Sequence, residues 1–272
     1  MLGGGERLPL RGKAALVCGA SRGIGRACAR EFARLGARVT LVARSEESLQ
    51  KALKELPAEG GSDGAPPLHD YLAIDFDQPS AVGDLVSRYL EQGGTFQILL
   101  NNTGGPPGGP ILEAEPPAFL KAFTNHLVCN QVLAQLLVPG MKDSGYGRII
   151  NIISTSIRQP IRGLGVSNTV RAAVASWAKT LSSDLAVFGI TVNNVLPGAT
   201  RTERLLQIIR DRARAAGRSE AEVEEEMKRE IPAGRFAEPE EIAAAAAFLA
   251  LPVAGYITGI SLAVDGGRTV AL

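Results

Sequence analysis

Glycine, hydroxyl and arginine residues near the N-terminus have the spacing of a phosphate-binding site. Gly19, Gly23 and Gly25 follow an apolar run, Ala14 to Val17, and precede a helix-like segment, Arg26 to Leu35. A strand, a glycine turn and a helix place unpaired backbone N–H groups at the positive end of the helix, where a pyrophosphate binds. A plain tight turn is the alternative interpretation. We expect a dinucleotide to lie on Gly19, Ser21, Arg22, Gly23, Ile24 and Gly25.

The next predicted strand, Ala37 to Arg44, bears on the choice between the two nicotinamide dinucleotides. An acidic residue at the end of this strand normally binds the ribose 2′-hydroxyl of NAD. This chain has Ala43 and Arg44 there, and Arg22 lies in the glycine turn. Two guanidinium groups can bind a 2′-phosphate through charge-assisted bidentate bonds, so we predict NADP(H). Two solvated surface arginines are the alternative.

Hydroxyl, amide and basic residues later in the chain could act on a carbonyl group. Ser154 ends a predicted β-branched strand, Gly147 to Ser154. Ser167 and Arg171 share one face of the predicted helix Val166 to Val187, because they are four residues apart. Carbonyl reduction by a nicotinamide needs a hydride donor and a proton source at the forming alkoxide.

The elements that must position these residues alternate between strand and helix. Further strands are predicted at Tyr71 to Ile74, Phe96 to Leu100 and Ile190 to Leu196, and Pro117 to Met141 is predicted as one long helix. This alternation predicts an α/β fold with a Rossmann-type, doubly wound parallel sheet and helices on both faces. Ligands of such a sheet bind beyond the carboxyl ends of its strands, where these motifs fall. We find no second domain in residues 1–272.

Composition excludes several classes of protein. A formal net charge of +1 over 272 residues argues against a nucleic-acid binder that depends on a positive field. The three cysteines, Cys18, Cys28 and Cys129, lack metal-ligand spacing, so we expect no metal and buried free thiols. No apolar run approaches the roughly 20 residues of a membrane-spanning helix, and there is no secretory signal. A cytoplasmic location is expected.

The motifs resemble those of the short-chain dehydrogenase/reductase family across Lys13 to Gly267. The glycines are spaced G-x-x-x-G-x-G, Asn101-Asn102-Thr103-Gly104 is similar to the family's Asn-Asn-Ala-Gly signature, and the final third is similar to 3-oxoacyl-thioester reductases. The resemblance implies a homodimer or homotetramer, a helical substrate lid at about 203–231, a carbonyl-polarising role for Ser154 and a proton-relay role for Asn125. It also implies cofactor contacts at Asp75, Phe76, Asn102, Gly104, Arg171, Pro197, Gly198, Thr200 and Thr202.

The chain departs from the family pattern at the proton donor. Ser167 and Arg171 stand where the family has Tyr-x-x-x-Lys. A serine hydroxyl is a poor general acid compared with a tyrosine whose pKa a nearby cation lowers, and guanidinium does not shuttle protons. None of the four tyrosines is an obvious substitute. His126 is a candidate donor, although a helix-face histidine is the commoner role.

Three functions follow from this pattern. The first is an NADP(H)-dependent oxidoreductase acting on a small-molecule carbonyl or alcohol, with a divergent proton-donor site. The second is a catalytically impaired NADP(H)-binding pseudoenzyme with a structural or sensing role. A hydrolase using Ser154 or Ser167 is disfavoured, because neither serine stands at the centre of a G-x-S-x-G elbow.

Overall fold

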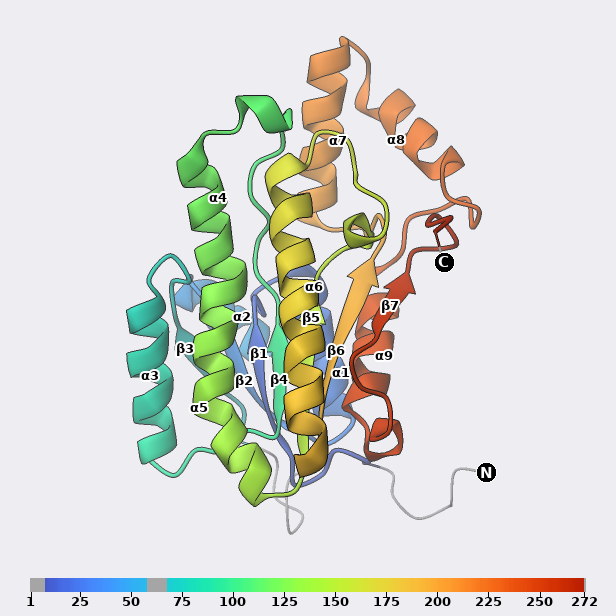
Figure 1. Ribbon diagram of the computed structural model, residues 1–272. Helices are drawn as coiled ribbons and strands as arrows, with labels where there is room; N and C mark the ends of the chain where they lie inside the picture. Colours follow the sequence, from blue (N-terminus) through green and yellow to red (C-terminus); the bar gives the residue numbers. More distant parts are fainter. Residues whose placement is uncertain (1–7, 58–67, 272) are drawn as a thin grey trace.

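A seven-stranded, all-parallel sheet forms the centre of the protein (Figure 1). The computed structural model describes residues 8–57 and 68–271. The Gly/Pro-rich run 57–67, for which the sequence predicts a surface loop, lies mostly outside the described residues. The strand order is β3-β2-β1-β4-β5-β6-β7. The strands are β1 (Ala14–Cys18), β2 (Arg38–Ala43), β3 (Asp70–Ala73), β4 (Ile98–Asn101), β5 (Gly147–Ile152), β6 (Ile190–Pro197) and β7 (Ser261–Val264). The order reverses between β1 and β4, which is where a doubly wound sheet binds its ligand.

Helices cover both faces of the sheet (Figure 1), which confirms the predicted doubly wound fold. One face is packed by α1 (Gly23–Arg34), α2 (Glu46–Leu53) and α9 (Pro239–Ala250). The other is packed by α3 (Pro79–Glu91), α5 (Cys129–Asp143) and α6 (Gly165–Leu185). The inner strands β1, β4 and β5 are buried along their whole length, and most of their residues are apolar because both faces of the sheet are covered.

A ladder of amide side chains crosses the buried centre of the sheet. Asn101 donates to Asn151 (Nδ2 to Oδ1, 2.8 Å), and Asn151 donates to Asn194 (3.0 Å). Asn194 then donates to the hydroxyl oxygen of Ser261 (3.1 Å). The four residues are direct neighbours in the strand register, so their bonds run from β4 to β7. The bonds satisfy the buried amides of Asn151 and Asn194 in part, whereas the Oδ1 atom of Asn101 has no hydrogen-bond partner in the described residues.

The predicted long helix over 117–141 has three parts. An α-helix, α4 (Pro116–Phe123), leads into a π-helical turn, Thr124–Val128, and α5 continues the helix. The prediction of one regular helix was therefore wrong at its middle. A π turn adds one residue to the helical turn and changes which side chains face inward, and such turns are frequent at functional sites. No glycine or proline marks the turn in the sequence.

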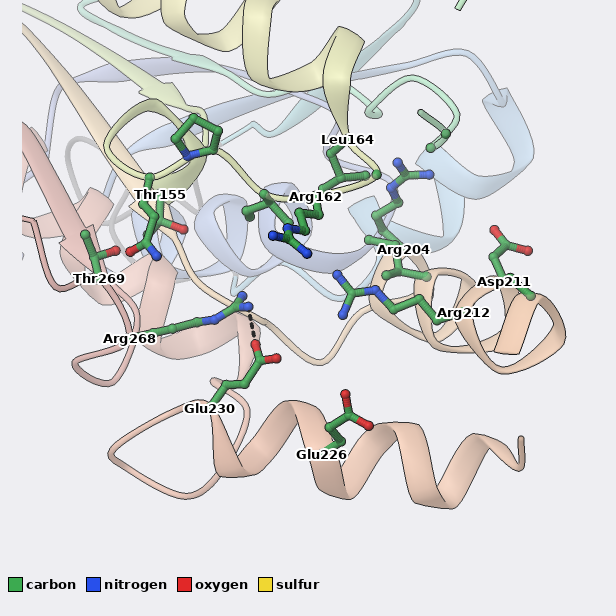
Figure 2. Close-up of a pocket in the computed structure, with 18 residues that line it drawn as sticks. Thr155, Arg162, Leu164, Arg204, Asp211, Arg212, Glu226, Glu230, Arg268 and Thr269 are labelled. Atoms are coloured by element: carbon green, nitrogen blue, oxygen red, sulfur yellow. Dashed lines mark hydrogen bonds and ion pairs between the residues drawn. The ribbon is translucent and has the colours of Figure 1, made fainter. Parts of the chain in front are cut away.

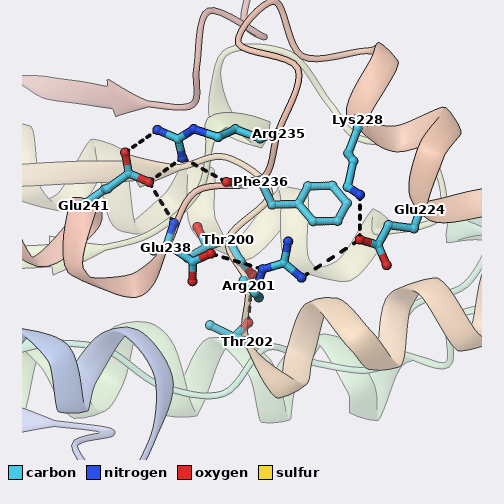
Figure 3. A network of polar contacts seen from close by, with 9 residues as sticks. All are labelled: Thr200, Arg201, Thr202, Glu224, Lys228, Arg235, Phe236, Glu238 and Glu241. Atoms are coloured by element: carbon cyan, nitrogen blue, oxygen red, sulfur yellow. Dashed lines mark hydrogen bonds and ion pairs between the residues drawn. The ribbon is translucent and has the colours of Figure 1, made fainter. Parts of the chain in front are cut away.

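Two further helices stand above the carboxyl end of the sheet: α7 (Glu203–Ala216) and α8 (Glu220–Arg229). They fall within the predicted lid segment 203–231 and share a small apolar core with Phe236. Figure 3 shows a polar network that joins them to the start of α9. Arg201 bonds Glu238 at 3.1 Å and approaches Glu224 at 4.0 Å, and Glu224 also pairs with Lys228 at 2.9 Å.

None of the helices described for residues 8–57 and 68–271 combines the length and apolarity that crossing a membrane requires.

Candidate functional site

The glycine turn between β1 and α1 is as tight as the spacing predicts. Gly19 has a φ of 62°, and a Cβ atom built on it would lie 2.5 Å from the carbonyl oxygen of Asn102. A Cβ on Gly25 would overlap the carbonyl oxygen of Gly19. Arg22, the residue that precedes α1, makes no side-chain capping bond, and the first turn contains no acidic residue. The N–H groups at this helix end are therefore available to an anion.

Arg22 and Arg44 are both exposed at the edge of this turn, and neither forms an ion pair within residues 8–57 and 68–271. Asp75 accepts a bond from the backbone N–H of Asp77 at 3.0 Å. The Phe76 ring belongs to the core and is only 8% exposed, so little of it is free to contact a ligand.

The ends of β4 and β6 close around the same turn. The Asn102 amide donates to the carbonyl oxygens of Cys18 (3.3 Å) and Gly19 (3.4 Å). Thr202 caps α7, and its methyl carbon would lie 3.3 Å from a Cβ built on Gly23. The site residues Gly19, Gly23, Asn102 and Thr202 thus meet in space. Gly104 is exposed, and a Cβ built on it would contact no described atom within 4 Å.

The loop after β6 is held by its own backbone and hydroxyl groups. Pro197 ends the strand, and the N–H of Gly198 donates to Val264 at 3.0 Å. The hydroxyl of Thr200 donates to the carbonyl oxygen of Gly198 (3.2 Å), and that of Thr202 donates to the carbonyl oxygen of Thr200 (3.2 Å). These bonds fix the loop beside the glycine turn.

Arg171 anchors the region around Ser154. Its Nη1 donates to the carbonyl oxygens of Ile152 (3.2 Å) and Ile153 (2.9 Å), directly before Ser154. Its Nε donates to the hydroxyl oxygen of Ser167 at 3.2 Å. The Ser154 hydroxyl accepts a bond from the backbone N–H of Ser156 at 3.1 Å. Burial, and secondarily the nearby Arg204 charge, lower the pKa of Arg171 to about 10.

His126, and not Asn125, faces this region. The Asn125 amide donates to Asp77 (2.7 Å), and no described hydrogen bond joins it to Ser154. His126 is 6% exposed, lies 2.6 Å from the Thr103 hydroxyl through its Nδ1, and belongs to the π turn. Burial, with a contribution from the Arg171 charge, lowers its pKa to about 3. The Oδ1 atom of Asn125 is buried and has no hydrogen-bond partner in the described residues, so the proton-relay role of Asn125 stays a prediction.

All four tyrosines lie elsewhere. Tyr71 donates to Glu46 (2.8 Å), Tyr89 stacks on Phe96, and Tyr146 donates to the carbonyl oxygen of Ala250. Tyr256 is fully exposed after α9. In the part of the chain that the structure describes, no group of His, Cys, Asp and Glu could hold a metal ion.

A cavity of about 790 Å³ is lined by Thr155, the residue that follows Ser154 in the chain (Figure 2). Its walls are the loop at Gly108 and Gly109, the loop 159–164, one side of α7, the end of α8, and Arg268 with Thr269. The sequence-based search missed Arg162, Arg204 and Arg212 in these walls. One signal was present: Arg204 follows the hydroxyl-rich loop directly and stands in the first turn of a predicted helix, where a cation is normally unfavourable.

Known proteins resemble the chain along almost all of its length. A family model described as enoyl-(acyl carrier protein) reductase matches residues 19–269. The chain is 32% identical over 258 residues to the 3-oxoacyl-(acyl-carrier-protein) reductase FabG of Vibrio cholerae, covering 95% of this chain and 98% of the relative.

Solved structures share the fold. An L-sorbose reductase from Gluconobacter frateurii, complexed with NADPH and L-sorbose, has a TM-score of 0.88 at 30% identity, covering 98% of this chain and 100% of that chain. A 3-ketoacyl-(acyl-carrier-protein) reductase from Brucella melitensis, complexed with NADH, has a TM-score of 0.81 at 29% identity, covering 96% and 100%. The neighbours therefore include proteins complexed with either dinucleotide.

Proposed function

This chain belongs to the short-chain dehydrogenase/reductase family, and on that premise we propose that it is an NADP(H)-dependent oxidoreductase acting on a carbonyl–alcohol pair. One observation carries the proposal most strongly. A helix end without a side-chain cap and a glycine turn lie at the same edge of the sheet as Ser154 and Arg171. Arg22 and Arg44 lie there as well, and neither forms an ion pair with a residue that the structure describes. An anion-binding turn at a strand-order reversal is the usual place of a dinucleotide.

The residues present fit NADP(H) along its length. Backbone N–H groups at the start of α1 suit the pyrophosphate, and Arg22 with Arg44 suits a 2′-phosphate, for which the strand end offers no competing carboxylate. The adenosine is assigned to Asp75, Asn102 and Gly104, and the buried Phe76 offers it little surface. The nicotinamide half is assigned to Arg171, Pro197, Gly198, Thr200 and Thr202.

Bound NADPH would supply the hydride that reduces the carbonyl carbon. The Ser154 hydroxyl orients the carbonyl oxygen. The Arg171 guanidinium, fixed by three hydrogen bonds, stabilises the negative charge that develops on this oxygen. Because Ser167 and Arg171 replace the family's Tyr and Lys, we assign the proton to a water molecule. Losing a positioned general acid costs on the order of 10² to 10⁴ in rate, so we expect slow turnover or an activated substrate.

One observation favours the alternative, an NADP(H)-binding pseudoenzyme. The Ser167 hydroxyl is engaged by Arg171, and the tyrosines of the chain make their contacts elsewhere. In that case the cofactor would stabilise the protein or report redox state. The cytoplasmic location and the homodimeric or homotetrameric state implied by the family belong to the proposal in either form.

The experiment is a titration with NADPH and NADP⁺ followed by turnover assays on diketones, quinones and acyl thioesters. We expect tight NADPH binding and measurable NADPH oxidation with at least one carbonyl. The double variant Ser167→Tyr/Arg171→Lys should raise ketoreductase activity. Tight binding with no turnover, in both the natural protein and this variant, would favour the pseudoenzyme. Absence of NADP(H) binding would refute both forms.

A further inference from the structure

The cavity lined by Thr155 contains more basic than acidic side chains. Four arginines line it, namely Arg162, Arg204, Arg212 and Arg268. Its carboxylates are Asp211, Glu226 and Glu230.

Two of those carboxylates form ion pairs, one with the cavity residue Arg268 and one with Arg218, which lies outside the lining. Glu230 pairs with Arg268 at 2.5 Å, as Figure 2 shows, and Glu226 pairs with Arg218 at 2.5 Å. Asp211 accepts a bond from the side-chain amide of Gln207 at 2.9 Å. The other three cavity arginines, Arg162, Arg204 and Arg212, form no ion pair in residues 8–57 and 68–271.

Figure 2 shows Arg162 and Arg212 extending toward one another from opposite walls of the cavity. Arg204 points from α7 toward the loop before Gly108, and its Nη2 donates to the carbonyl oxygen of Pro106 at 2.6 Å. Burial lowers the pKa of the Arg204 guanidinium, and the neighbouring Asp211 carboxylate offsets only part of this effect. A half-buried cation without a bound anion is costly, so the arrangement is suited to one.

Arg204 also lies close to the proposed reaction centre. A Cβ atom built on Gly105 would be 3.6 Å from Nη2 of Arg204 and 3.7 Å from Nη2 of Arg171, so the two guanidinium groups flank one space. Arg204 stands in the first turn of α7, whose N–H groups add positive potential. The positive charges of Arg171 and Arg204 repel one another, and an anion bound beside them would reduce this repulsion.

We infer that the substrates of this protein carry an anionic group, a carboxylate or a phosphate, that Arg204 binds, while Arg162 and Arg212 attract it from the outer part of the cavity. The inference rests on the proposed oxidoreductase function and adds the substrate class. A guanidinium binds either anion through two parallel bonds. A cavity of about 790 Å³ is in the size range of small-molecule sites.

The test compares matched acids and neutral analogues on the NADP⁺-loaded protein, which needs no turnover. The pairs are acetoacetate with ethyl acetoacetate, and dihydroxyacetone phosphate with dihydroxyacetone, measured by calorimetry at constant ionic strength. Arg204→Gln removes the proposed contact, and Arg204→Lys keeps its charge. Arg210→Gln is the control, because Arg210 is on the same helix, pairs with Glu203 and does not line the cavity.

We expect at least one acid to bind the natural protein more tightly than its neutral analogue, which identifies carboxylate or phosphate as the recognised group. Arg204→Gln should weaken that acid by about tenfold or more, the usual effect of losing a charge-assisted bond, and leave the neutral analogue unchanged. Arg204→Lys should restore part of the loss, and Arg210→Gln should match the natural protein.

Three results would overturn the inference. The first is that no acid binds better than its neutral analogue. The second is that Arg204→Gln leaves acid binding intact. The third is that Arg204→Gln weakens NADP⁺ binding but not the preference for the acid, which would assign Arg204 to a cofactor phosphate. Because binding is measured without turnover, a catalytically silent protein that selects acids would refute the oxidoreductase and leave the anion site standing.

Discussion

Burial of His126 predicts a loss of stability in mild acid. Its pKa is lowered from 6.5 to about 3 in the folded protein, chiefly by burial and secondarily by the Arg171 charge. Between these values the unfolded chain binds a proton that the folded chain does not, so folding becomes less favourable as the pH falls. The contribution is fully present above pH 6.5 and is lost as the pH drops toward 3.

The magnitude follows from the same values. Each pH unit in this interval costs about 1.4 kcal/mol, so the free energy of unfolding should be about 2 kcal/mol lower at pH 5 than at pH 7. Between pH 7 and pH 5 the change in stability comes mainly from the histidines. Carboxylates with lowered pKa values, such as Glu241, have a pKa of 4.5 in the unfolded chain, so they change stability mainly below that pH.

The assay is urea-induced unfolding at pH 7, 6 and 5, read by tryptophan fluorescence and circular dichroism. His126→Asn cannot titrate, so its stability should change much less between pH 7 and 5, whatever its stability at pH 7. His69→Asn is the comparison variant, because His69 is the other histidine and burial lowers its pKa as well. It lies at the amino end of the sheet, so this variant measures the part of the pH dependence that does not come from His126. An unchanged slope in His126→Asn would refute the reasoning.

Three further outcomes follow from packing and burial. Asn151→Leu should lower the free energy of unfolding by about 2 to 5 kcal/mol in urea titrations, because its two amide partners would be left buried and unpaired; a change below 1 kcal/mol would contradict this. Gly25→Ala should abolish NADPH binding in calorimetry, because its Cβ atom would overlap the carbonyl oxygen of Gly19. Gly140→Ala, on an open helix face, should bind NADPH normally, and equal binding by both variants would show that the turn tolerates a side chain. The three buried thiols should not react with a disulfide reagent at pH 8 until the protein is denatured, because burial raises their pKa values; rapid labelling of the native protein would contradict this.

The fold could be predicted in outline from the sequence. Apolar β-branched runs separated by amphipathic segments have few arrangements other than a parallel sheet covered on both faces, and the structure has that sheet. The glycine turn was equally predictable, because its close contacts at Gly19 and Gly25 exclude side chains.

The inward-facing residues were not predictable in the same way. The family resemblance indicates Asn125, whereas the buried His126 that contacts Thr103 belongs to a π turn for which helical periodicity carries no signal. The cationic cavity also escaped the sequence, because Arg162 and Arg204 come from segments far apart in the chain. Each looks like a solvated arginine until the loop and α7 are brought together in space.

The ladder of Asn101, Asn151 and Asn194 also has a consequence for how the strands pair during folding. Parallel strands joined by long crossovers meet late and slowly during folding, and an apolar strand slides easily past its neighbour into a mispaired state. Asn151 and Asn194 pair in the native alignment, and a one-residue shift between β5 and β6 would place Asn194 opposite Ile150 or Ile152 and break this bond. Mispaired intermediates thereby carry an energetic penalty that an all-aliphatic sheet would lack.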